Sequence, residues 1–333
     1  MSMMLELYVA PKRDIAPKGD FAPEGDFSTI SEALLAIPYN QKATIFIAEG
    51  VYEEKIFCEK KNITLIGAGP GKTIIKWADH ADKMHQDGRK YGTFRSYTAF
   101  FAGRVVTIKD LSILNTSDYD IRNGAIAAYV DTEIANFTNV HFESYQNTLF
   151  CAPLPGDERE KGEFLGPRMH TPRHASFQFY HNCKIAGNID FIFGGGDVLF
   201  HACEIISKSS EQPGYIAAPS GKNEGAGFVF TDCQFTAIEL PLGTVFLARP
   251  WSENAKIALL NCYLDAHINE AGFSAGNLTD SVEKNASTTF IEHGSYGPGA
   301  NLSKRVQWVK KLDFEASLQL NMRIESATKA WGI

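Results

Sequence analysis

The sequence predicts an all-β chain wound as a parallel β-helix, and three observations support this fold class. One short phrase recurs, in which a polar or small residue precedes an apolar residue or Cys, any residue, and a second apolar residue. Shorter runs of alternating hydropathy lie between its copies. Coils of about 20–30 residues joined by variable loops are typical of β-solenoids. The copies that contain Cys follow one another at intervals of 20, 30 and 29 residues, at Cys183, Cys203, Cys233 and Cys262.

Each copy of the phrase is expected to be a strand whose second and fourth side chains point inward, because strand residues alternate between two faces. Stacked coils would then bring these side chains into one buried ladder. An antiparallel sandwich is the alternative, but a sandwich does not repeat one phrase in register. The copies are Asn62–Leu65, Asp110–Ile113, Asn139–Phe142, Asn182–Ile185, Ala202–Ile205, Asp232–Phe235 and Asn261–Leu264.

The whole chain, residues 1–333, is expected to form a single domain, because each coil of a solenoid packs only on its neighbours. We expect an N-terminal cap at about 20–40, coils at about 41–300 and a C-terminal tail at about 301–333.

Two segments have helical spacing and one has none. Apolar residues at helical spacing predict a capping helix over Ser28–Ile37, which stops at Pro38, and weaker spacing predicts a helix over Asp313–Ala330. The stretch Ala152–Arg173 contains Pro, Gly and charges without periodicity. We expect it to be a long loop that walls a binding cleft.

Composition argues against several classes of function. The formal net charge is −7, and no basic stripe marks a nucleic-acid-binding face. No run of about 18 apolar residues predicts a membrane span, and the first residues do not resemble a secretory signal. We therefore expect a monomeric cytoplasmic protein, or a secreted one if a signal was removed before Met1.

Cofactor chemistry is not expected either. The six Cys form no CxxC pair, and four of them recur at one repeat position, so we expect free buried thiols and not disulfides or a zinc site. The run Gly67–Thr73 lacks the first Gly of a phosphate loop, and Pro70 removes a backbone donor. We interpret it as a turn, and we expect no metal and no organic cofactor.

Three segments carry candidate chemistry: Tyr145–Phe150, Gly187–Gly194 and Phe246–Trp251. In the second, Asp190 lies among apolar residues, where a carboxylate needs a partner. In the third, Arg249 can hold a carboxylate in a fixed fork. Such a pair on a solenoid is more often structural than catalytic, so the pair alone does not decide the function.

These segments resemble motifs of the pectin methylesterases, namely Tyr-Gln-Asp-Thr-Leu-Tyr, Gly-x-Val-Asp-Phe-Ile-Phe-Gly and Leu-Gly-Arg-Pro-Trp. The resemblance covers about residues 20–310 in the same order, and it implies a right-handed parallel β-helix. It also implies hydrolysis of C6 methyl esters of galacturonosyl units in pectin or methylated oligogalacturonides. Further similar segments are Gly50–Glu54, Leu65–Gly67, Phe94-Arg95 and Tyr296–Ala300.

The resemblance assigns roles to individual residues. Asp190 matches the nucleophile that forms an acyl-enzyme, and Arg249 matches the arginine that orients it and keeps it ionised. Gln146 matches a hydrogen-bond donor to the tetrahedral oxyanion, and Asn147 occupies the adjacent catalytic position. The expected substrate-binding surface comprises Trp251, Phe191, Phe150, Tyr145 and Gly124.

Two positions depart from the family pattern. Where the family has an Asp that acts as general acid and then base, this chain has Asn147. An amide cannot relay a proton, and loss of such help typically costs ~10²–10⁴-fold in rate. Where the family has a second oxyanion Gln, this chain has Gly124, and one lost oxyanion donor costs ~10²–10³-fold.

Several explanations stay open at this point. Asn147 could be an engineered change, which leaves Gly124 unexplained. The enzyme could act on a different ester or a shorter substrate, with its proton supplied by Asp197, His141 or Glu143. The chain could also be a catalytically impaired relative that binds oligogalacturonate. Pectate-lyase chemistry would need a calcium-binding carboxylate cluster, and the sequence shows none.

Overall fold

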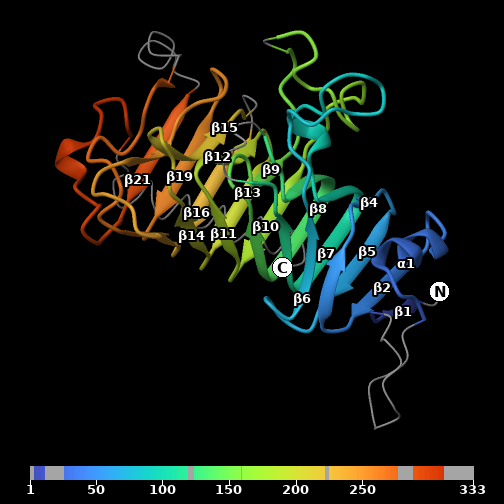
Figure 1. Cartoon of the computed structure of the whole chain (residues 1–333). Coiled ribbons are helices and arrows are strands. Elements are labelled where there is room, and N and C mark those ends of the chain that lie inside the picture. Colours follow the sequence, from blue (N-terminus) through green and yellow to red (C-terminus); the bar gives the residue numbers. More distant parts are fainter. Residues whose placement is uncertain are drawn as a thin grey trace.

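The described strands wind into a parallel β-helix whose stacked coils form three parallel sheets, one on each face (Figure 1). This confirms the predicted fold class. The expected helix at Asp313–Ala330 lies outside the described part of the chain. The computed structural model describes residues 4–11, 26–118, 124–158, 160–221, 225–276 and 288–310.

Two long strands, β7 (Ala99–Asn115) and β8 (Ala128–Glu143), run through all three sheets and pair in parallel along most of their length. Shorter strands extend each sheet on both sides of this pair. The first sheet adds β1 (Leu5–Val9), β2 (Lys42–Ile47), β5 (Asn62–Ile66), β10 (Phe177–His181), β13 (Asp197–His201), β16 (Phe228–Thr231), β19 (Lys256–Leu260) and β21 (Thr289–His293). The second adds β3 (Gly50–Glu53), β6 (Thr73–Trp77), β11 (Lys184–Gly187), β14 (Glu204–Ser207), β17 (Gln234–Ala237) and β20 (Tyr263–Leu264). The third adds β4 (Ile56–Cys58), β9 (Leu149–Cys151), β12 (Ile189–Gly194), β15 (Gly214–Pro219) and β18 (Val245–Ala248).

The repeated phrase marks the corner between the first and second sheets. In six of its seven copies the first residue has a positive φ of 51–56°, a left-handed conformation that Asn and Asp tolerate better than most residues. In the four Cys copies the second-sheet strand starts only at the third residue, so the expectation that each whole phrase is a strand is corrected. The six residues are Asp110, Asn139, Asn182, Ala202, Asp232 and Asn261.

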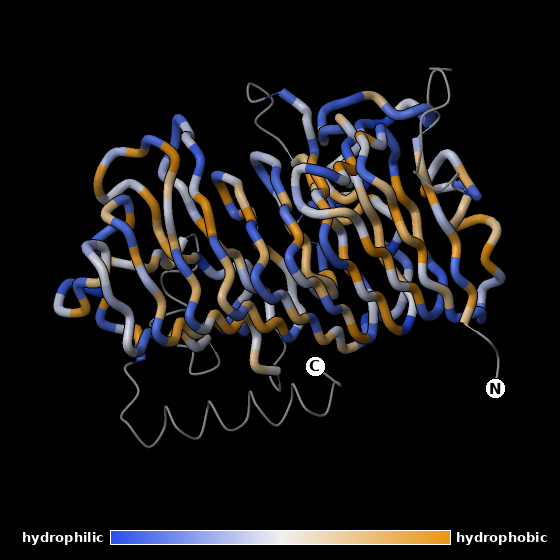
Figure 2. The backbone as a smooth tube through the Cα atoms, turned by 90° about the horizontal axis from the view of Figure 1, so that it is seen from below, coloured by the Kyte–Doolittle hydropathy of each residue, from blue (hydrophilic) through white to orange (hydrophobic). Residues whose placement is uncertain are grey.

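The interior of the β-helix is the predicted ladder. The second and fourth side chains of every copy are at most 2% exposed, and all six Cys are free and buried, as expected. Aromatic rings in the first sheet stack from coil to coil, with centroid distances of 4.8 Å for Phe137–Tyr180, 4.9 Å for Tyr180–Phe200 and 4.4 Å for Phe200–Phe230. Figure 2 shows the corresponding alternation of polar and apolar residues along the coils.

The N-terminal end is covered by helix α1 (Ile30–Ala36), which confirms the expected capping helix with slightly narrower bounds. Its N-cap is Thr29, whose hydroxyl accepts from the backbone N–H of Glu32 at 3.2 Å. Strand β1, which pairs with β2 in the first coil, is an element that the sequence did not predict. Within the described residues there are also two short 3₁₀ helices, η1 (Thr93–Arg95) and η3 (Leu302–Lys304).

No helix within the described ranges is both long and apolar enough to cross a membrane.

Candidate active site

A break in the third sheet presents Asp190 to solvent. Strand β12 pairs with β15 at Ile189–Tyr215 and again at Ile192–Ala217, so two residues of β12 oppose one residue of β15. Such a bulge re-aims side chains, and Asp190 within it has a positive φ of 46°. The Asp190 side chain is 16% exposed on the outer surface, whereas the next side chain turns into the core.

Arg249, just after β18, holds the Asp190 carboxylate in a fork. Its Nε lies 2.9 Å from Oδ1 and 3.2 Å from Oδ2, and its second guanidinium nitrogen donates to Oδ2 at 2.5 Å. The guanidinium also lies 4.1 Å from the centroid of the Tyr215 ring. Burial works to lower the pKa of Arg249, but the bonds to Asp190 outweigh it and the pKa lies above its usual value. The arginine therefore stays charged and fixes the carboxylate orientation.

Asn147 approaches Asp190 from the segment just before β9. Its side-chain N–H donates to the backbone carbonyl of Asp190 at 3.0 Å, and the residue is 7% exposed. The amide thus holds the backbone of the bulge. It has no titrating proton, so it cannot act as an acid or a base.

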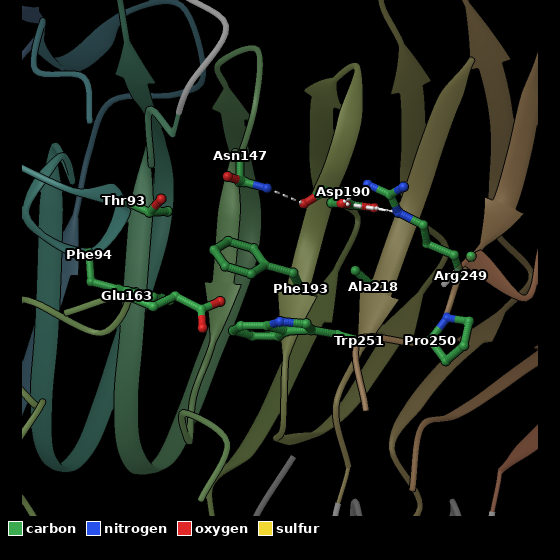
Figure 3. Close-up of a pocket in the computed structure, with 11 residues that line it drawn as sticks. Thr93, Phe94, Asn147, Glu163, Asp190, Phe193, Ala218, Arg249, Pro250 and Trp251 are labelled. Atoms are coloured by element: carbon green, nitrogen blue, oxygen red, sulfur yellow. Dashed lines mark hydrogen bonds and ion pairs between the residues drawn. The ribbon is translucent and has the colours of Figure 1, made fainter. Parts of the chain in front are cut away.

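These three residues meet at a pocket of about 260 Å³, which Figure 3 shows in close-up. Of the predicted site residues, the structure brings together Asp190, Arg249, Asn147 and Trp251 there. The remaining lining residues were not predicted as part of the site. They are Thr93, Phe94, Glu163, Phe193, Ala218, Pro250 and Gly276.

The other predicted residues are not among those that line the pocket. Phe191 and Phe150 are fully buried, Phe191 in the main core and Phe150 in an aromatic cluster below the pocket, so neither can offer a sugar-binding surface. Because the bulge shifts the strand alternation by one residue, Phe193 takes the surface position expected of Phe191. Tyr145 lies under Lys208, whose ammonium is 3.7 Å from the ring centroid. Gln146 is half-buried, and its backbone carbonyl accepts from the N–H of Ala125 at 2.6 Å.

Gly124 is packed against Thr93. A Cβ at residue 124 would lie 2.6 Å from the Thr93 hydroxyl oxygen and 2.9 Å from its Cα, and the φ of Gly124 is +34°. A glutamine at this position therefore does not fit unless the Thr93 backbone moves. The space that a side chain at 124 would enter is filled by Thr93, which lines the pocket itself.

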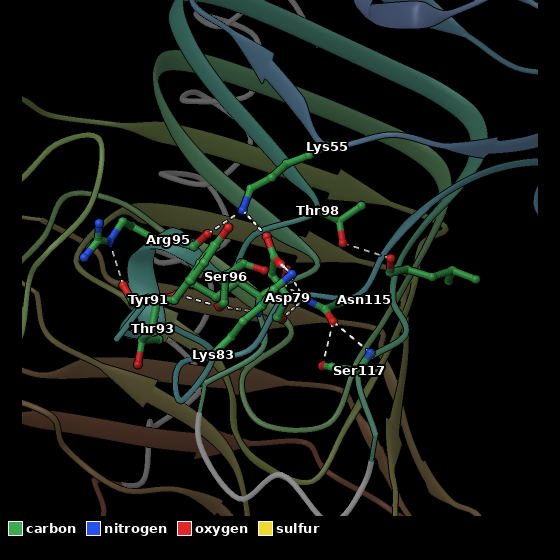
Figure 4. Close-up of polar contacts among 12 residues, drawn as sticks. Lys55, Asp79, Lys83, Tyr91, Thr93, Arg95, Ser96, Thr98, Asn115 and Ser117 are labelled. Carbon is green, nitrogen blue, oxygen red and sulfur yellow. Dashed lines mark hydrogen bonds and ion pairs between the residues drawn. The ribbon is translucent and has the colours of Figure 1, made fainter. Parts of the chain in front are cut away.

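A buried polar network supports the pocket wall around η1 (Figure 4). Asp79 is 1% exposed and accepts from Lys55 at 2.5 Å and from Lys83 at 2.6 Å. Lys55 also donates to the backbone carbonyl of Arg95 at 2.7 Å. Burial tends to raise the pKa of Asp79, but the two lysines lower it overall, so the carboxylate stays ionised. The network thereby fixes the segment that carries Thr93.

The loop at 152–173 forms the facing wall, as the sequence predicted. Arg168 donates to the buried carboxylate of Asp131 at 2.6 Å, and His174 lies 3.1 Å from its other oxygen. Phe164 is 3% exposed and packs on the Phe94 and Trp251 rings, with centroid distances of 5.9 and 6.4 Å. These anchors hold Glu163 at the pocket.

None of the three proton donors suggested by the sequence lines the pocket. Glu143 pairs with His141 at 3.3 Å and with Lys208 at 2.9 Å, and these partners lower the pKa of Glu143 to about 2. Asp197 accepts from the backbone N–H of Gly227 at 3.0 Å. All three side chains have structural partners elsewhere on the β-helix.

Fold and site together define a parallel β-helix with a carboxylate–guanidinium pair in a surface pocket. The pectinesterase family model matches residues 20–154 and 169–320, and the chain belongs to that family. It is 31% identical over 306 residues to a pectinesterase/pectinesterase inhibitor of Prunus persica, covering 88% of this chain and 52% of that one. A pectinesterase of Petunia integrifolia is 30% identical over 294 residues, covering 84% and 70%.

The chain spans only part of some curated relatives, including 39% of an Arabidopsis thaliana protein named for both pectinesterase and pectinesterase inhibitor. Among solved structures, the pectin methylesterase from carrot superposes with a TM-score of 0.73 at 26% identity, covering 92% of this chain and 88% of that one. This likeness confirms the right-handed parallel β-helix.

Proposed function

We propose that this protein is a carboxylic-ester hydrolase that removes methyl groups from C6 methyl esters of galacturonosyl units. The observation that carries the proposal is the Asp190–Arg249 pair, because the two guanidinium nitrogens hold the Asp190 carboxylate in a fixed orientation at the surface of a pocket. Asp190 attacks the ester carbonyl and forms an acyl-enzyme, and water then hydrolyses the acyl-enzyme.

The pocket also fits the substrate class. The rings of Phe193 and Trp251 line one side of it (Figure 3), and apolar ring faces suit the C–H faces of sugars. Polar groups on the other side come from Asn147, Asp190 and Arg249. The family membership supports methylated pectin or its oligogalacturonides as the source of the ester.

Methanol release from methylated oligogalacturonides tests the proposal. The protein should release methanol, and Asp190→Asn, which keeps the shape of the side chain but not its charge, should reduce the rate by at least ~10³-fold, as for other lost nucleophiles. Asp157→Asn, on the exposed part of the 152–173 loop, is the matched control and should keep the wild-type rate. An unchanged rate for Asp190→Asn would remove the acyl-enzyme mechanism.

The same assay tests the alternative function, that of a catalytically impaired protein that binds oligogalacturonate. If the unmodified protein releases no methanol but binds oligogalacturonate, it is a binding protein of the same family, as Asn147 and the filled Gly124 position would allow.

The cytoplasmic location and the monomeric state of the protein stay predictions, which cell fractionation and light scattering would check.

A further inference from the structure

The pocket lacks a proton-transferring group where the family pattern has one, because Asn147 occupies that position. Of the eleven residues that line the pocket, two carry carboxylates, Asp190 and Glu163. We propose that Glu163 is the general acid and base of this esterase, acting from the opposite wall in place of the missing aspartate. The inference rests on the proposed esterase function and goes beyond it, since no motif marks Glu163.

The position of Glu163 is set by its neighbours on both sides. The carboxylate of Glu158 accepts from the backbone N–H of Gly162 at 2.9 Å and from that of Phe164 at 3.0 Å, so the turn is clamped directly before and after Glu163. These bonds lower the pKa of Glu158, which therefore remains ionised and able to hold the turn. The buried Phe164 ring then fixes the turn to the aromatic cluster.

The side chain points into the pocket. Figure 3 shows the Glu163 carboxylate directed toward the rings of Phe193 and Trp251, whereas Asp190 and Asn147 approach from the β-helix surface. An ester bound between the two walls would present its carbonyl carbon to Asp190 and its methoxy oxygen to the loop. This places the acid on the leaving-group side, which is where a proton is needed.

The proposed cycle balances with water as the sole co-reactant. Asp190 adds to the carbonyl carbon, the bond to the methoxy oxygen breaks, and protonated Glu163 gives its proton to that oxygen, so that methanol leaves. The resulting Glu163 carboxylate takes a proton from water, and the hydroxide adds to the acyl carbon. The bond to Asp190 breaks, which yields the galacturonate carboxyl group, free Asp190 and protonated Glu163.

Steady-state methanol release by Glu163 variants tests this role. Glu163→Gln should lower kcat by ~10²–10⁴-fold, as is typical for loss of a general acid–base group, with little change in KM. Glu160→Gln removes the same charge from an exposed position on the same loop and should behave as wild type. The smaller Glu163→Ala variant should regain activity when sodium formate is added, because formate can replace the lost carboxyl group.

A second variant separates proton transfer from loop structure. Adding Asn147→Asp to Glu163→Gln should raise kcat by roughly tenfold or more, because the carboxyl group returns at the other wall. If Glu163→Gln keeps the wild-type kcat while Asp190→Asn is inactive, the inference is overturned and the proposed function stands. Equal losses in Glu163→Gln and Glu160→Gln, or a loss that neither formate nor Asn147→Asp restores, would also overturn it. If the unmodified protein releases no methanol, the function and the inference fall together.

Discussion

The interior ladder and the pocket are built by opposite means. In the ladder, each coil repeats the same kind of side chain at the same register, as in the stack of Phe137, Tyr180, Phe200 and Phe230. In the pocket, the lining residues come from several kinds of element, including a 3₁₀ helix, a bulge, a loop and a strand end. Repetition gives stability that is shared among coils, whereas the pocket depends on local departures from the repeat.

This difference predicts that stability and activity can be perturbed separately. The largest effect is expected for Phe200→Ala, because Phe200 is fully buried between two stacked rings. The free energy of unfolding should fall by about 3–5 kcal/mol, as for other buried Phe truncations. Urea unfolding followed by circular dichroism measures it.

The matched control is Phe57→Ala, since Phe57 also stacks on a ring, that of Phe100, but is 50% exposed. Phe57→Ala should lower the free energy of unfolding by much less than Phe200→Ala does. The folded fraction of Phe200→Ala should keep its methanol-release rate, because Phe200 does not line the pocket. A rate that falls with Phe200→Ala while stability holds would contradict the separation of ladder and pocket.

The ladder is also the part that the sequence predicts well. Period-two alternation and the recurrence of Cys183, Cys203, Cys233 and Cys262 specify inward positions, and all of them are buried. The phrase alone did not show that Asn182 and its equivalents form a left-handed corner, although Asn and Asp at a fixed position are a signal for it. Strand β1 was missed because a short edge strand has too few residues to show a repeat.

Of the residues that line the pocket, the sequence predicts only those that lie in a segment resembling a family motif. Asp190, Arg249, Asn147 and Trp251 were placed correctly together, since each belongs to a resembling segment. Phe191 was expected at the surface from its place in a resembling segment, but it is buried in the core and Phe193 lines the pocket. Glu163 carries no sequence signal, since a loop without periodicity does not show which side chain faces inward. Thr93 precedes the Phe94-Arg95 pair that resembled the family, and that proximity was a usable hint.

A middle-sized effect is expected where the repeat and the pocket meet, at Gly124. Gly124→Ala should destabilise the protein by about 1–3 kcal/mol through overpacking, because the new Cβ meets both the hydroxyl and the Cα of Thr93. The same shift should displace the pocket wall and lower the methanol-release rate. Urea unfolding and the methanol assay measure the two effects.

Gly71→Ala separates backbone strain from this contact. Gly71 also has a positive φ, +77°, but a Cβ there would meet nothing within 4 Å. The loss of unfolding free energy in Gly71→Ala should therefore reflect the backbone conformation alone, and this variant should release methanol at the wild-type rate. If both glycine variants lose equal stability and equal activity, the contact with Thr93 has no role in shaping the pocket.

The smallest effect is expected at the anchor of the pocket loop, where His174 meets Asp131. The hydrogen bond that His174 donates to Asp131 raises the pKa of His174 above its usual value of about 6.5, and burial opposes it only in part. A raised folded-state pKa means that the contribution to stability is fully present below about pH 6.5 and is lost as pH rises through the higher folded value. Burial tends to raise the pKa of Asp131, but His174 and Arg168 lower it overall, so the carboxylate stays ionised throughout this range.

Unfolding free energies of the unmodified protein and of His174→Gln, compared at pH 6 and pH 9, measure this contribution. The unmodified protein should be more stable by up to about 1 kcal/mol at pH 6, as for other partly exposed ion pairs, and the difference should shrink at pH 9. His170→Gln, at an exposed position of the same loop, should show no such difference. If His174→Gln is as stable as the unmodified protein at both pH values, Arg168 alone anchors the loop to Asp131, and the pocket wall carrying Glu163 does not respond to the charge of His174.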